Sequence, residues 1–398
     1  MPWKVSSIMS QRFEFCTLAS SGDVPISDLC RAFGISRQTG YKWLKRFHES
    51  GINDLNDRSR RPHHSPFRTC VDVEAMIVSL RKKYPAWGPR KLHRLLRDRL
   101  AKHRLPSVVT VARILKRQGL IEAVEPAPVW PAVGRFERPH PNDLWQMDLK
   151  GALRLPDGRK IYPVGILDDH SRYLIQLQMV TDASDDSTLR CWIGAAASHG
   201  LPKATLTDHG PQFRMVDEES SAFRVYLWAC GVHHTQGRVA HPQTQGKIER
   251  FWRTLKDELL SRRAYSDPAS WQSSFDEWRH IYNHVRPHQE LDDEPPVSRY
   301  RNSDRSYVEP NRFARIGYSG SQYRRVSPRG QISLGGKRKM IGRGYSGWTV
   351  EIRPLGDGCW HVYFRDQLVK EIMLTHQINQ LKLPRSREIL RISRLNKQ

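Results

Sequence analysis

The apolar positions of the first sixty residues predict two helices joined by a tight turn. An apolar stripe that includes Ile26, Leu29 and Cys30 has helical spacing, and the glycine-containing segment 34–36 interrupts it. Ser36 is a favourable N-cap for a second helix. The apolar residues expected on the buried side of that helix are Tyr41, Trp43, Leu44 and Phe47.

The second of these helices begins with polar side chains. A helix, a glycine-containing turn and a helix form the helix-turn-helix arrangement, whose second helix enters the major groove of DNA. Arg and Gln side chains there can read base edges. An ordinary pair of packed helices would show the same stripes, but the glycine and the polar first turn favour DNA binding. We therefore predict DNA contacts at Arg37, Gln38, Thr39 and Lys42.

A second helical module is predicted from residue 71 to residue 119. Its three apolar stripes are separated by a turn at Trp87-Gly-Pro and by Ser107, which would cap the third helix. Many of its basic residues lie off the stripes, so the module resembles a second helix-turn-helix unit, although a solvated basic face would look the same. The stripes are Val73, Met76, Ile77 and Leu80; Leu92, Leu95 and Leu96; and Val111, Ile114 and Leu115, and the basic residues are Arg90, Lys91, Arg94, Arg113, Lys116 and Arg117.

The proline-rich segment 124–141 marks a boundary, after which strands and helices alternate. Three strand-like runs come first, and helices and short strands then follow in turn. Three antiparallel strands followed by this alternation are typical of the ribonuclease-H-like α/β fold. The predicted strands are 142–153, 160–167, 172–180, 203–207 and 232–235, and the predicted helices are 187–198, 220–230, 244–262 and 271–284.

The chain beyond residue 300 changes character again. Five short strand-like runs separated by glycines predict a small β-barrel or SH3-like fold. From Arg299 onward, 21 Lys and Arg face 7 Asp and Glu, so this region would bind phosphate. The predicted multidomain organisation is a helix-turn-helix domain (1–60), a second helical DNA-binding domain (61–123), a linker (124–141), a ribonuclease-H-like catalytic core (142–300), a small DNA-binding β-barrel (301–375) and a basic tail (376–398).

Composition narrows the range of partners. The 398 residues carry a formal net charge of +24, which points to a polyanion and most readily to nucleic acid. Hydrophobic residues make up 38% of the chain, which excludes wholesale disorder. No segment is long and apolar enough to span a bilayer, so a membrane partner is not expected. The six cysteines are scattered without a Cys-x-x-Cys pair, which favours a reducing compartment and argues against a zinc site of paired cysteines.

Three carboxylates stand in contexts that would bring them to one site. Asp148 lies in the first predicted strand of the core, Asp208 directly follows a later strand, and Glu249 lies in a segment of helical periodicity. Two strand-borne aspartates and one helix-borne glutamate can converge on hard divalent cations. Oxygen ligands suit Mg²⁺ or Mn²⁺, and two ions about 4 Å apart clamp both oxygens of an in-line phosphoryl displacement.

The helix that carries Glu249 has two distinct stripes. One is apolar and should face the sheet, and the neighbouring stripe carries Glu249, Arg253 and Lys256. A surface Glu–Arg pair at spacing i, i+4 would explain the charged stripe by itself. Together with the two aspartates, metal binding by Glu249 and phosphate contacts by the cations are the better interpretation. The apolar stripe is Ile248, Trp252, Leu255 and Leu259.

Other candidate ligands are weaker. Asp168 and Asp169 follow an apolar strand, but their place before Ser171 favours a turn with a local cap. His280, His284 and His288 are four residues apart, yet Pro287 should end the helix before the last of them. His209 follows Asp208 and could orient a phosphate or a water, or serve only in a turn.

Several motifs resemble those of a known family. The segments 145–148 (Trp-Gln-Met-Asp), 207–210 (Thr-Asp-His-Gly) and 241–251 (His-Pro-Gln-Thr-Gln-Gly-Lys-Ile-Glu-Arg-Phe) look like the signature blocks of DDE transposases of bacterial insertion sequences, which share the core of retroviral integrases. Residues 282–291 and 87–92 resemble motifs that follow and precede that core. The resemblance covers roughly residues 20–300. It departs from the family in a longer spacing between Asp208 and Glu249, with the acidic run 217–219 expected in the extra loop, and in lacking the His-His-Cys-Cys zinc module of retroviral integrases.

The resemblance implies a site and partners. Asp148, Asp208 and Glu249 would be catalytic and would bind two Mg²⁺ or Mn²⁺ ions. Partners would be the terminal inverted repeats of the element and target DNA, bound by at least a dimer, in the bacterial cytoplasm in association with the nucleoid. The resemblance implies a DNA contact near the site at Lys256. We also predict DNA contacts at Arg253, Lys247 and Arg250.

The predicted function is metal-dependent DNA cleavage at element ends followed by strand transfer into target DNA. A catalytically silent, domesticated DNA-binding regulator with the same fold is the alternative, and intact carboxylates argue against it. A nuclease acting on RNA–DNA hybrids is a further alternative, for which two flanking DNA-binding modules are excessive.

Overall fold

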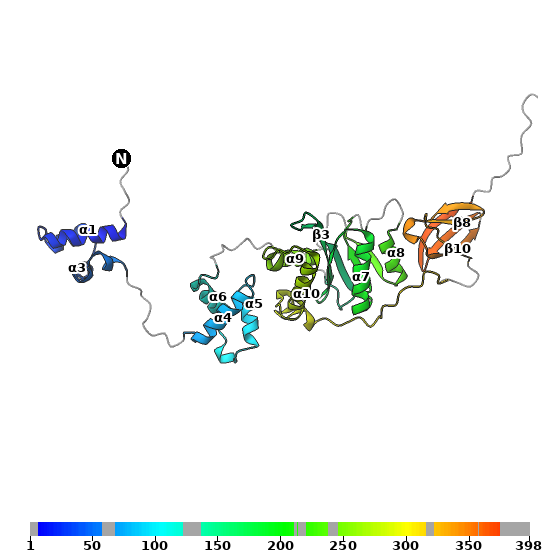
Figure 1. The fold of residues 1–398 in the computed structure, drawn as a ribbon. Coiled ribbons are helices and arrows are strands. Elements are labelled where there is room, and N and C mark those ends of the chain that lie inside the picture. Colours follow the sequence, from blue (N-terminus) through cyan, green and yellow to red (C-terminus); the bar gives the residue numbers. More distant parts are fainter. Residues whose placement is uncertain are drawn as a thin grey trace, which may run out of the picture. The chain divides into compact units, whose positions relative to one another are not determined.

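The computed structural model divides the chain into two compact units, Met1–Thr69 and Cys70–Gln398 (Figure 1). Several sequence-based expectations lie outside the described residues: the acidic run 217–219, most of the linker, the first part of the third signature block and the basic tail. The structure describes residues 7–57, 68–121, 137–210, 213, 220–237, 246–315, 322–356 and 358–374.

The first unit is a small helical domain with the expected turn. Ser36 caps α3 by accepting a hydrogen bond from the Thr39 amide, and Gly34 in the turn has φ +64°, where glycine avoids strain. The predicted apolar stripe of α3 is wrong at Tyr41, whose side chain is 56% exposed, because the helix turns that position away from α1 and α2. The elements are α1 (Ile8–Ser21), α2 (Ile26–Ala32), α3 (Arg37–Ser50) and η1 (Gly51–Leu55).

The second unit begins with the predicted three-helix module. Its stripes meet in one core, Ser107 caps α6 as expected, and Tyr84 stacks on Trp87 with ring centroids 4.0 Å apart. Ile281 and Val285, which follow later in the chain, pack against the same core. The elements are α4 (Val71–Lys83), α5 (Pro89–Arg97), η2 (Lys102–Arg104) and α6 (Val108–Arg117).

The basic face of α5 is paired with carboxylates of the core. Arg94 Nη2 and Arg97 Nη2 each lie 2.6 Å from Glu294, and Arg90 Nε lies 2.7 Å from Asp293. These arginines therefore belong to an interface within the unit and are not a purely solvated face. The motifs at 87–92 and 282–291 also meet, since Trp87 and Val285 belong to the same apolar cluster.

A mixed sheet forms the centre of the second unit. β1 pairs antiparallel with β3 and parallel with β5, which places it in the middle of the order β2-β3-β1-β5-β6, and β4 pairs with β3. The antiparallel pairing of β1, β3 and β4 confirms the three predicted antiparallel strands, but the predicted strand 142–153 is divided into β1 and β2, which both pair with β3. The strands are β1 (Leu144–Leu149), β2 (Leu153–Arg154), β3 (Lys160–Asp168), β4 (Leu174–Val180), β5 (Ala204–Thr207) and β6 (His233–Gln236).

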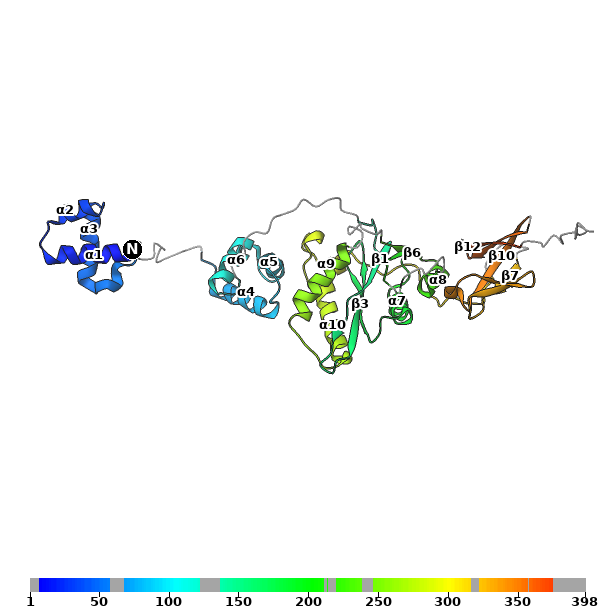
Figure 2. The same cartoon turned by 90° about the horizontal axis from the view of Figure 1, so that it is seen from above.

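Helices cover both faces of this sheet (Figure 2). Side chains of α9 and α10 form one apolar cluster with Leu167, Leu174 and Leu177, and side chains of α7 and α8 share another with Val164 and Ile166. None of the described helices is long and apolar enough to cross a membrane. The helices are α7 (Asp185–His199), α8 (Ala222–Ala229), α9 (Gly246–Leu255), the π-helical turn η5 (Lys256–Leu260) and α10 (Pro268–His284), followed by η6 (Gln289–Leu291) and η7 (Pro296–Ser298).

The C-terminal strands form two antiparallel sheets. One has the order β12-β11-β10-β7, and β8 pairs with β9 in the other. Among the described residues the ladders do not close on themselves, so a barrel is not confirmed. The elements are β7 (Gln322–Arg325), β8 (Gln331–Leu334), β9 (Lys337–Met340), η8 (Arg343–Tyr345), β10 (Thr349–Gly356), β11 (Cys359–Phe364) and β12 (Gln367–Met373).

These strands are attached to the core through α8. The Tyr345 hydroxyl donates to Ser220 Oγ at 3.2 Å, and the ring of Trp348 meets Tyr226 edge-on. A Cβ atom on Gly344 would lie 2.0 Å from the Ser220 carbonyl oxygen, so only glycine permits this approach. The C-terminal sheets and the core thus share one apolar cluster.

Candidate active site

Asp148 occupies the central strand of the sheet and is held by two hydrogen bonds. Its Oδ1 accepts from the Leu149 amide at 2.8 Å, and its Oδ2 accepts from Trp252 Nε1 at 2.7 Å. Trp252 belongs to α9, so this bond ties the helix to the strand. The carboxylate has a fixed orientation before any cation binds.

Asp208 lies beside Asp148. β1 and β5 run parallel with Leu144, Trp145 and Gln146 opposite residues 204–206, so continuing this register brings residue 208 opposite Asp148. Burial raises the pKa of Asp148 to about 6; the Trp252 hydrogen bond opposes this rise, and the negative charge of Asp208 adds to it. Two carboxylates that repel each other in a half-buried place are suited to sharing a cation.

The first residues after β5 are held by two side-chain contacts. Asp208 Oδ1 accepts from the Gly210 amide at 2.9 Å, and His209 Nε2 lies 2.6 Å from the carbonyl oxygen of Gly237. His209 therefore joins this loop to the end of β6. Of the two roles expected for His209, the turn role is the one these contacts display.

Glu249 lies on the exposed side of α9, one residue after the buried Ile248. Trp252, Leu255 and Leu259 are buried as predicted, which confirms the two stripes of this helix. The structure does not gather all three carboxylates closely: within the described part of the chain, Asp148, Asp208 and Glu249 are not among the groups whose ligand atoms lie within 4.8 Å of one another. The two aspartates are neighbours, and Glu249 stands on the helix tied to one of them.

A buried polar network anchors the first turn of α9. Lys247 Nζ lies 2.7 Å from Asp169 Oδ2, and Gln146 Nε2 donates to Asp169 Oδ1 at 2.8 Å. The Ile248 amide donates to Gln146 Oε1 at 3.3 Å. These bonds link β1 and the residue that follows β3 to the two helix residues directly before Glu249. Sequence reasoning did not find them; a glutamine on a strand that is buried on both faces was the available signal.

Asp168 has the capping role that sequence favoured, whereas Asp169 has another structural role. Asp168 is fully buried, and its carboxylate accepts from the amide and the hydroxyl of Ser171 and from the Asn142 amide. It therefore caps the turn after β3. Asp169 is fully buried as well and serves the network around α9.

The cations predicted to contact DNA fall into two groups. Arg250, Arg253 and Lys256 are exposed on the same helix as Glu249. Lys247 is half-buried, and burial, opposed by Asp169, lowers its pKa. The ion pair accounts for Lys247 without DNA, whereas the other three remain predicted phosphate contacts.

Most of the DNA contacts predicted on α3, the second helix of the helix-turn-helix arrangement, are exposed to solvent. Arg37, Gln38 and Lys42 are exposed, with the Lys42 ammonium 4.4 Å from the centre of the Trp43 ring. Thr39 is half-buried and takes part in the cap with Ser36. Base contacts by these residues remain predictions.

The histidines spaced four apart do not form a ligand set within the described residues. His280 and His284 stack with ring centroids 4.7 Å apart. His288 is turned elsewhere, with a ring nitrogen 3.2 Å from Arg286, and burial lowers its pKa well below the usual value. The weak metal interpretation of these residues gains no support.

The donor set around Asp148 fits a hard divalent cation. Carboxylate oxygens are the ligands that Mg²⁺ and Mn²⁺ prefer, and a cation would offset both the burial of the Asp148 charge, which chiefly raises its pKa, and the smaller repulsion from Asp208. Asp148 and Asp208 could hold it directly, and Glu249 could join them from α9.

Family models match the chain in four places. Two models, each described as an integrase core domain, match residues 138–242 and 230–296. Two models described as homeodomain-like domains match residues 11–56 and 39–115. The integrase-core matches include all three candidate carboxylates, and the homeodomain-like matches extend over the two helical modules.

Proteins of bacterial mobile elements are similar to the chain. A 39.2 kDa protein of insertion element IS476 from Xanthomonas euvesicatoria is 26% identical over 236 residues, 59% of this chain and 66% of the relative. A 31.7 kDa protein of insertion element IS407 from Burkholderia multivorans is 25% identical over 72% of this chain and 88% of its own length. The transposase of transposon Tn552 from Staphylococcus aureus is 23% identical over 61% and 54%. The aligned part thus spans slightly under two thirds of the IS476 protein.

A solved structure of the HTLV-2 integrase catalytic core domain in complex with magnesium also matches. It covers 40% of this chain and 97% of its own, with 15% identity and a TM-score of 0.31.

Proposed function

We infer that this chain is a DDE-type transposase with an integrase-like catalytic core, which cleaves DNA strands and transfers them to target DNA. The two integrase-core matches and the similarity to insertion-element proteins and to the Tn552 transposase support this function. The homeodomain-like matches add DNA-binding modules ahead of the core.

The observation that carries the site assignment is the pairing of Asp148 and Asp208. Asp148 lies on β1 and Asp208 directly follows the neighbouring parallel strand β5, their charges repel, and the helix bearing Glu249 is hydrogen-bonded to Asp148 through Trp252. In this proposal the three carboxylates are the catalytic residues. Trp252 and Gln146 are positioning residues, because they act on the site through Asp148 and α9.

The carboxylates would hold two Mg²⁺ or Mn²⁺ ions. Such ions, when bound, activate an oxygen nucleophile and stabilise charge on both oxygens of an in-line displacement. Asp148 stays oriented by its two hydrogen bonds, and Glu249 faces solvent from which DNA can approach. Water attacks the phosphodiester at the element's end and releases a 3′-hydroxyl. That hydroxyl then attacks a target phosphodiester and displaces a target 3′-hydroxyl.

DNA would be bound by several parts of the chain. The exposed cations of α9 would contact phosphates beside the site, and α3 would read the terminal inverted repeats. The second helical domain and the basic C-terminal sheets, as a small barrel, would add phosphate contacts. Two element ends require at least a dimer. The proposed place of action is nucleoid DNA in a bacterial cytoplasm.

The test is a cleavage and joining assay on a labelled duplex carrying the element's end, with Mg²⁺ or Mn²⁺. Wild type should release a 3′-hydroxyl and join it to a second duplex. Glu249→Gln should lose both steps by at least about a hundredfold and keep DNA affinity, since one ligand is lost and the fold is not. Tight binding without cleavage by wild type, with either metal, would favour the silent regulator.

A further inference from the structure

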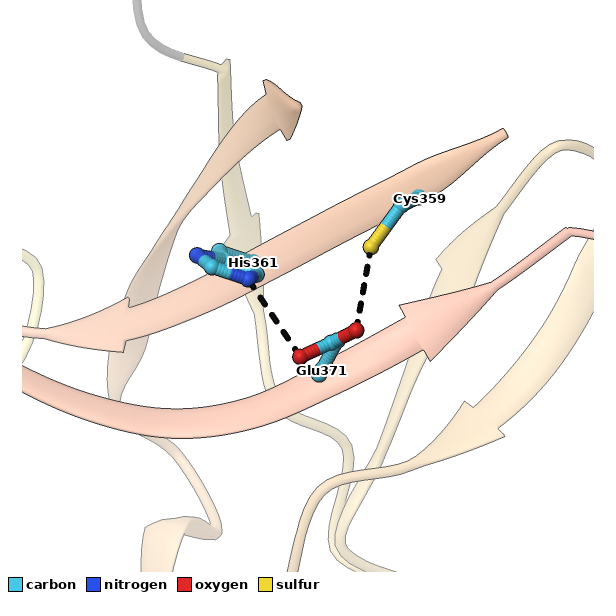
Figure 3. Close-up of side chains that lie close together, drawn as sticks. All are labelled: Cys359, His361 and Glu371. Atoms are coloured by element: carbon cyan, nitrogen blue, oxygen red, sulfur yellow. Dashed lines mark hydrogen bonds and ion pairs between the residues drawn. The ribbon is translucent and has the colours of Figure 1, made fainter. Parts of the chain in front are cut away.

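A second set of potential metal ligands lies far along the chain from the carboxylate site, in the C-terminal sheets (Figure 3). Cys359 and His361 are two apart on β11, so their side chains share one face of the strand. Glu371 on β12 is the register partner of His361. Three different donor types, sulfur, nitrogen and oxygen, thus converge across one pair of strands.

The spacing of the donor atoms suits a tetrahedral ion. Cys359 Sγ lies 3.3 Å from Glu371 Oε1, and His361 Nε2 lies 3.5 Å from Glu371 Oε2. Ligand atoms of all three residues lie within 4.8 Å of one another. A tetrahedral zinc ion with Zn–S near 2.3 Å and Zn–N or Zn–O near 2.0–2.1 Å separates its ligands by roughly 3.3–3.5 Å. Small side-chain adjustments would therefore seat the ion.

The second ring nitrogen of His361 already has a partner. Nδ1 lies 3.4 Å from the Tyr363 hydroxyl, which leaves Nε2 toward the cysteine and the glutamate. The Arg353 guanidinium stacks 4.0 Å from the centre of the Tyr363 ring and is bonded to Glu351. A metal-binding histidine usually has its other nitrogen fixed in this way.

The three side chains of this candidate site differ in their exposure to solvent. Cys359 is buried, the His361 side chain is 18% exposed and the Glu371 side chain 59% exposed. The sulfur therefore lies at the protected end and the carboxylate at an entrance open to solvent. An ion could therefore enter from the Glu371 side, where a water could serve as a fourth ligand.

We propose that Cys359, His361 and Glu371 bind one Zn²⁺ ion that joins β12 to β11. Thiolate and imidazole ligands select zinc over the hard cations suited to the carboxylate site. β12 is the last strand of its sheet and pairs on one side with β11, so the ion would add a second link between an edge strand and its neighbour. The proposal is independent of the proposed strand-transfer function, because it uses none of its residues.

The test is cobalt spectroscopy on the full chain. Metal-stripped protein is titrated with Co²⁺ in excess Mg²⁺, and a thiolate-to-cobalt charge-transfer band should saturate at one equivalent. Only a site with a cysteine can produce this band, so the carboxylate site does not contribute. Added Zn²⁺ should abolish it. Cys359→Ser should remove the band, whereas Cys70→Ser, which changes an exposed cysteine outside the set, should keep it.

A second variant tests the proposal independently in case Cys359→Ser does not fold. His361→Gln should retain the fold, as judged by circular dichroism, and weaken cobalt binding about 10- to 100-fold. At equal concentration, Zn²⁺ should raise the melting temperature of wild type more than that of either variant. A wild-type protein without the band, or a band that survives Cys359→Ser, would overturn the proposal. Asp148→Asn should keep the band, so loss of strand transfer and loss of zinc binding are separable.

Discussion

The surroundings of Asp148 disfavour the charged form of its carboxyl group. Its pKa in the fold, about 6, lies above the value near 3.9 expected for an unfolded chain. The folded metal-free protein therefore holds the proton more tightly than the unfolded chain. Stability associated with this group is greatest below about pH 4 and falls as the pH rises through 4 to 6, after which it stays constant.

Asp148→Asn should consequently stabilise the metal-free protein at pH 8, because the asparagine carries no charge and can still accept from Trp252. The gain should shrink steadily as the pH falls from 6 to 4. Chemical denaturation of both proteins across this range, in the presence of a chelator, measures it. A gain that does not change with pH would show that ionisation of Asp148 is not the cause.

Lys247 illustrates how the surroundings of a residue decide its role. Its partner Asp169 is fully buried, so Lys247→Met should leave an uncompensated charge and lower the free energy of unfolding by about 3–5 kcal/mol. Arg250→Met, one turn away on the exposed side, should leave stability unchanged and weaken DNA binding. Urea denaturation and DNA titration of the two variants separate these effects.

The double variant Asp169→Asn with Lys247→Met supplies the control. Removing both charges should restore part of the lost stability, since no buried charge is left alone. If Lys247→Met instead resembled Arg250→Met in both measurements, Lys247 would be a phosphate contact after all.

Spacing along the chain identified Asp148, Asp208 and Glu249 as candidates because each residue's own neighbours carry the signal. It could not reveal that Trp252 donates to Asp148 or that Gln146 supports Ile248. Helical periodicity predicts which side of α9 is buried, but it does not predict which strand atoms the side chains of α9 contact. Partners separated by about a hundred residues depend on the packed fold.

At the level of elements, the approach of α9 to the sheet depends on Gly165. This glycine is opposite Asp148 in the β1–β3 ladder, and a Cβ there would lie 3.0 Å from the rings of Phe251 and Trp252. Gly165→Ala should push the helix outward, disturb the hydrogen bond to Asp148 and cost about 1–3 kcal/mol of stability. Strand-transfer rates and urea denaturation should both show the loss.

Gly194→Ala is the matched control. Gly194 is an exposed position of α7, and no atom lies within 4 Å of a new Cβ there. Alanine there should preserve activity and raise stability by about 0.4–1 kcal/mol. Equal behaviour of the two variants would contradict a close helix–sheet contact at Gly165.

Elements with local signals were predictable, and those defined by distant pairing were less so. The caps at Ser36 and Ser107 act within three residues, and the structure has both. The prediction for Tyr41 was wrong because an amphipathic side chain such as tyrosine is found on both the buried and the exposed side of helices. Strand-like runs after residue 300 were recognised, but closure of a barrel depends on which strands pair, and periodicity does not state that.

At the scale of the whole second unit, an ion-pair interface joins the three-helix module to the core. Glu294 receives both Arg94 and Arg97, so Glu294→Gln should loosen α5 by roughly 1 kcal/mol or less, given its partial exposure. Amide hydrogen exchange in α5 should accelerate, while exchange in β1 should stay the same.

Asp292→Asn supplies a comparison, since Asp292 pairs with Arg299 on an exposed surface and does not contact α5. Its α5 exchange should match wild type, and added salt should reduce the difference between wild type and Glu294→Gln. Unchanged exchange in the glutamine variant would mean that the ion pairs of Glu294 do not help to hold the module.

The central position of β1 has a mechanical consequence. Asp148 lies on a strand with neighbours on both sides, whereas Glu249 belongs to a helix held by side-chain packing and a few polar bonds. The strand that carries Asp148 and the helix that carries Glu249, the two parts of the proposed site, therefore differ in stiffness. Small openings of the helix against the sheet can part them without melting the sheet, so the geometry of the reacting centre is set by the softer half.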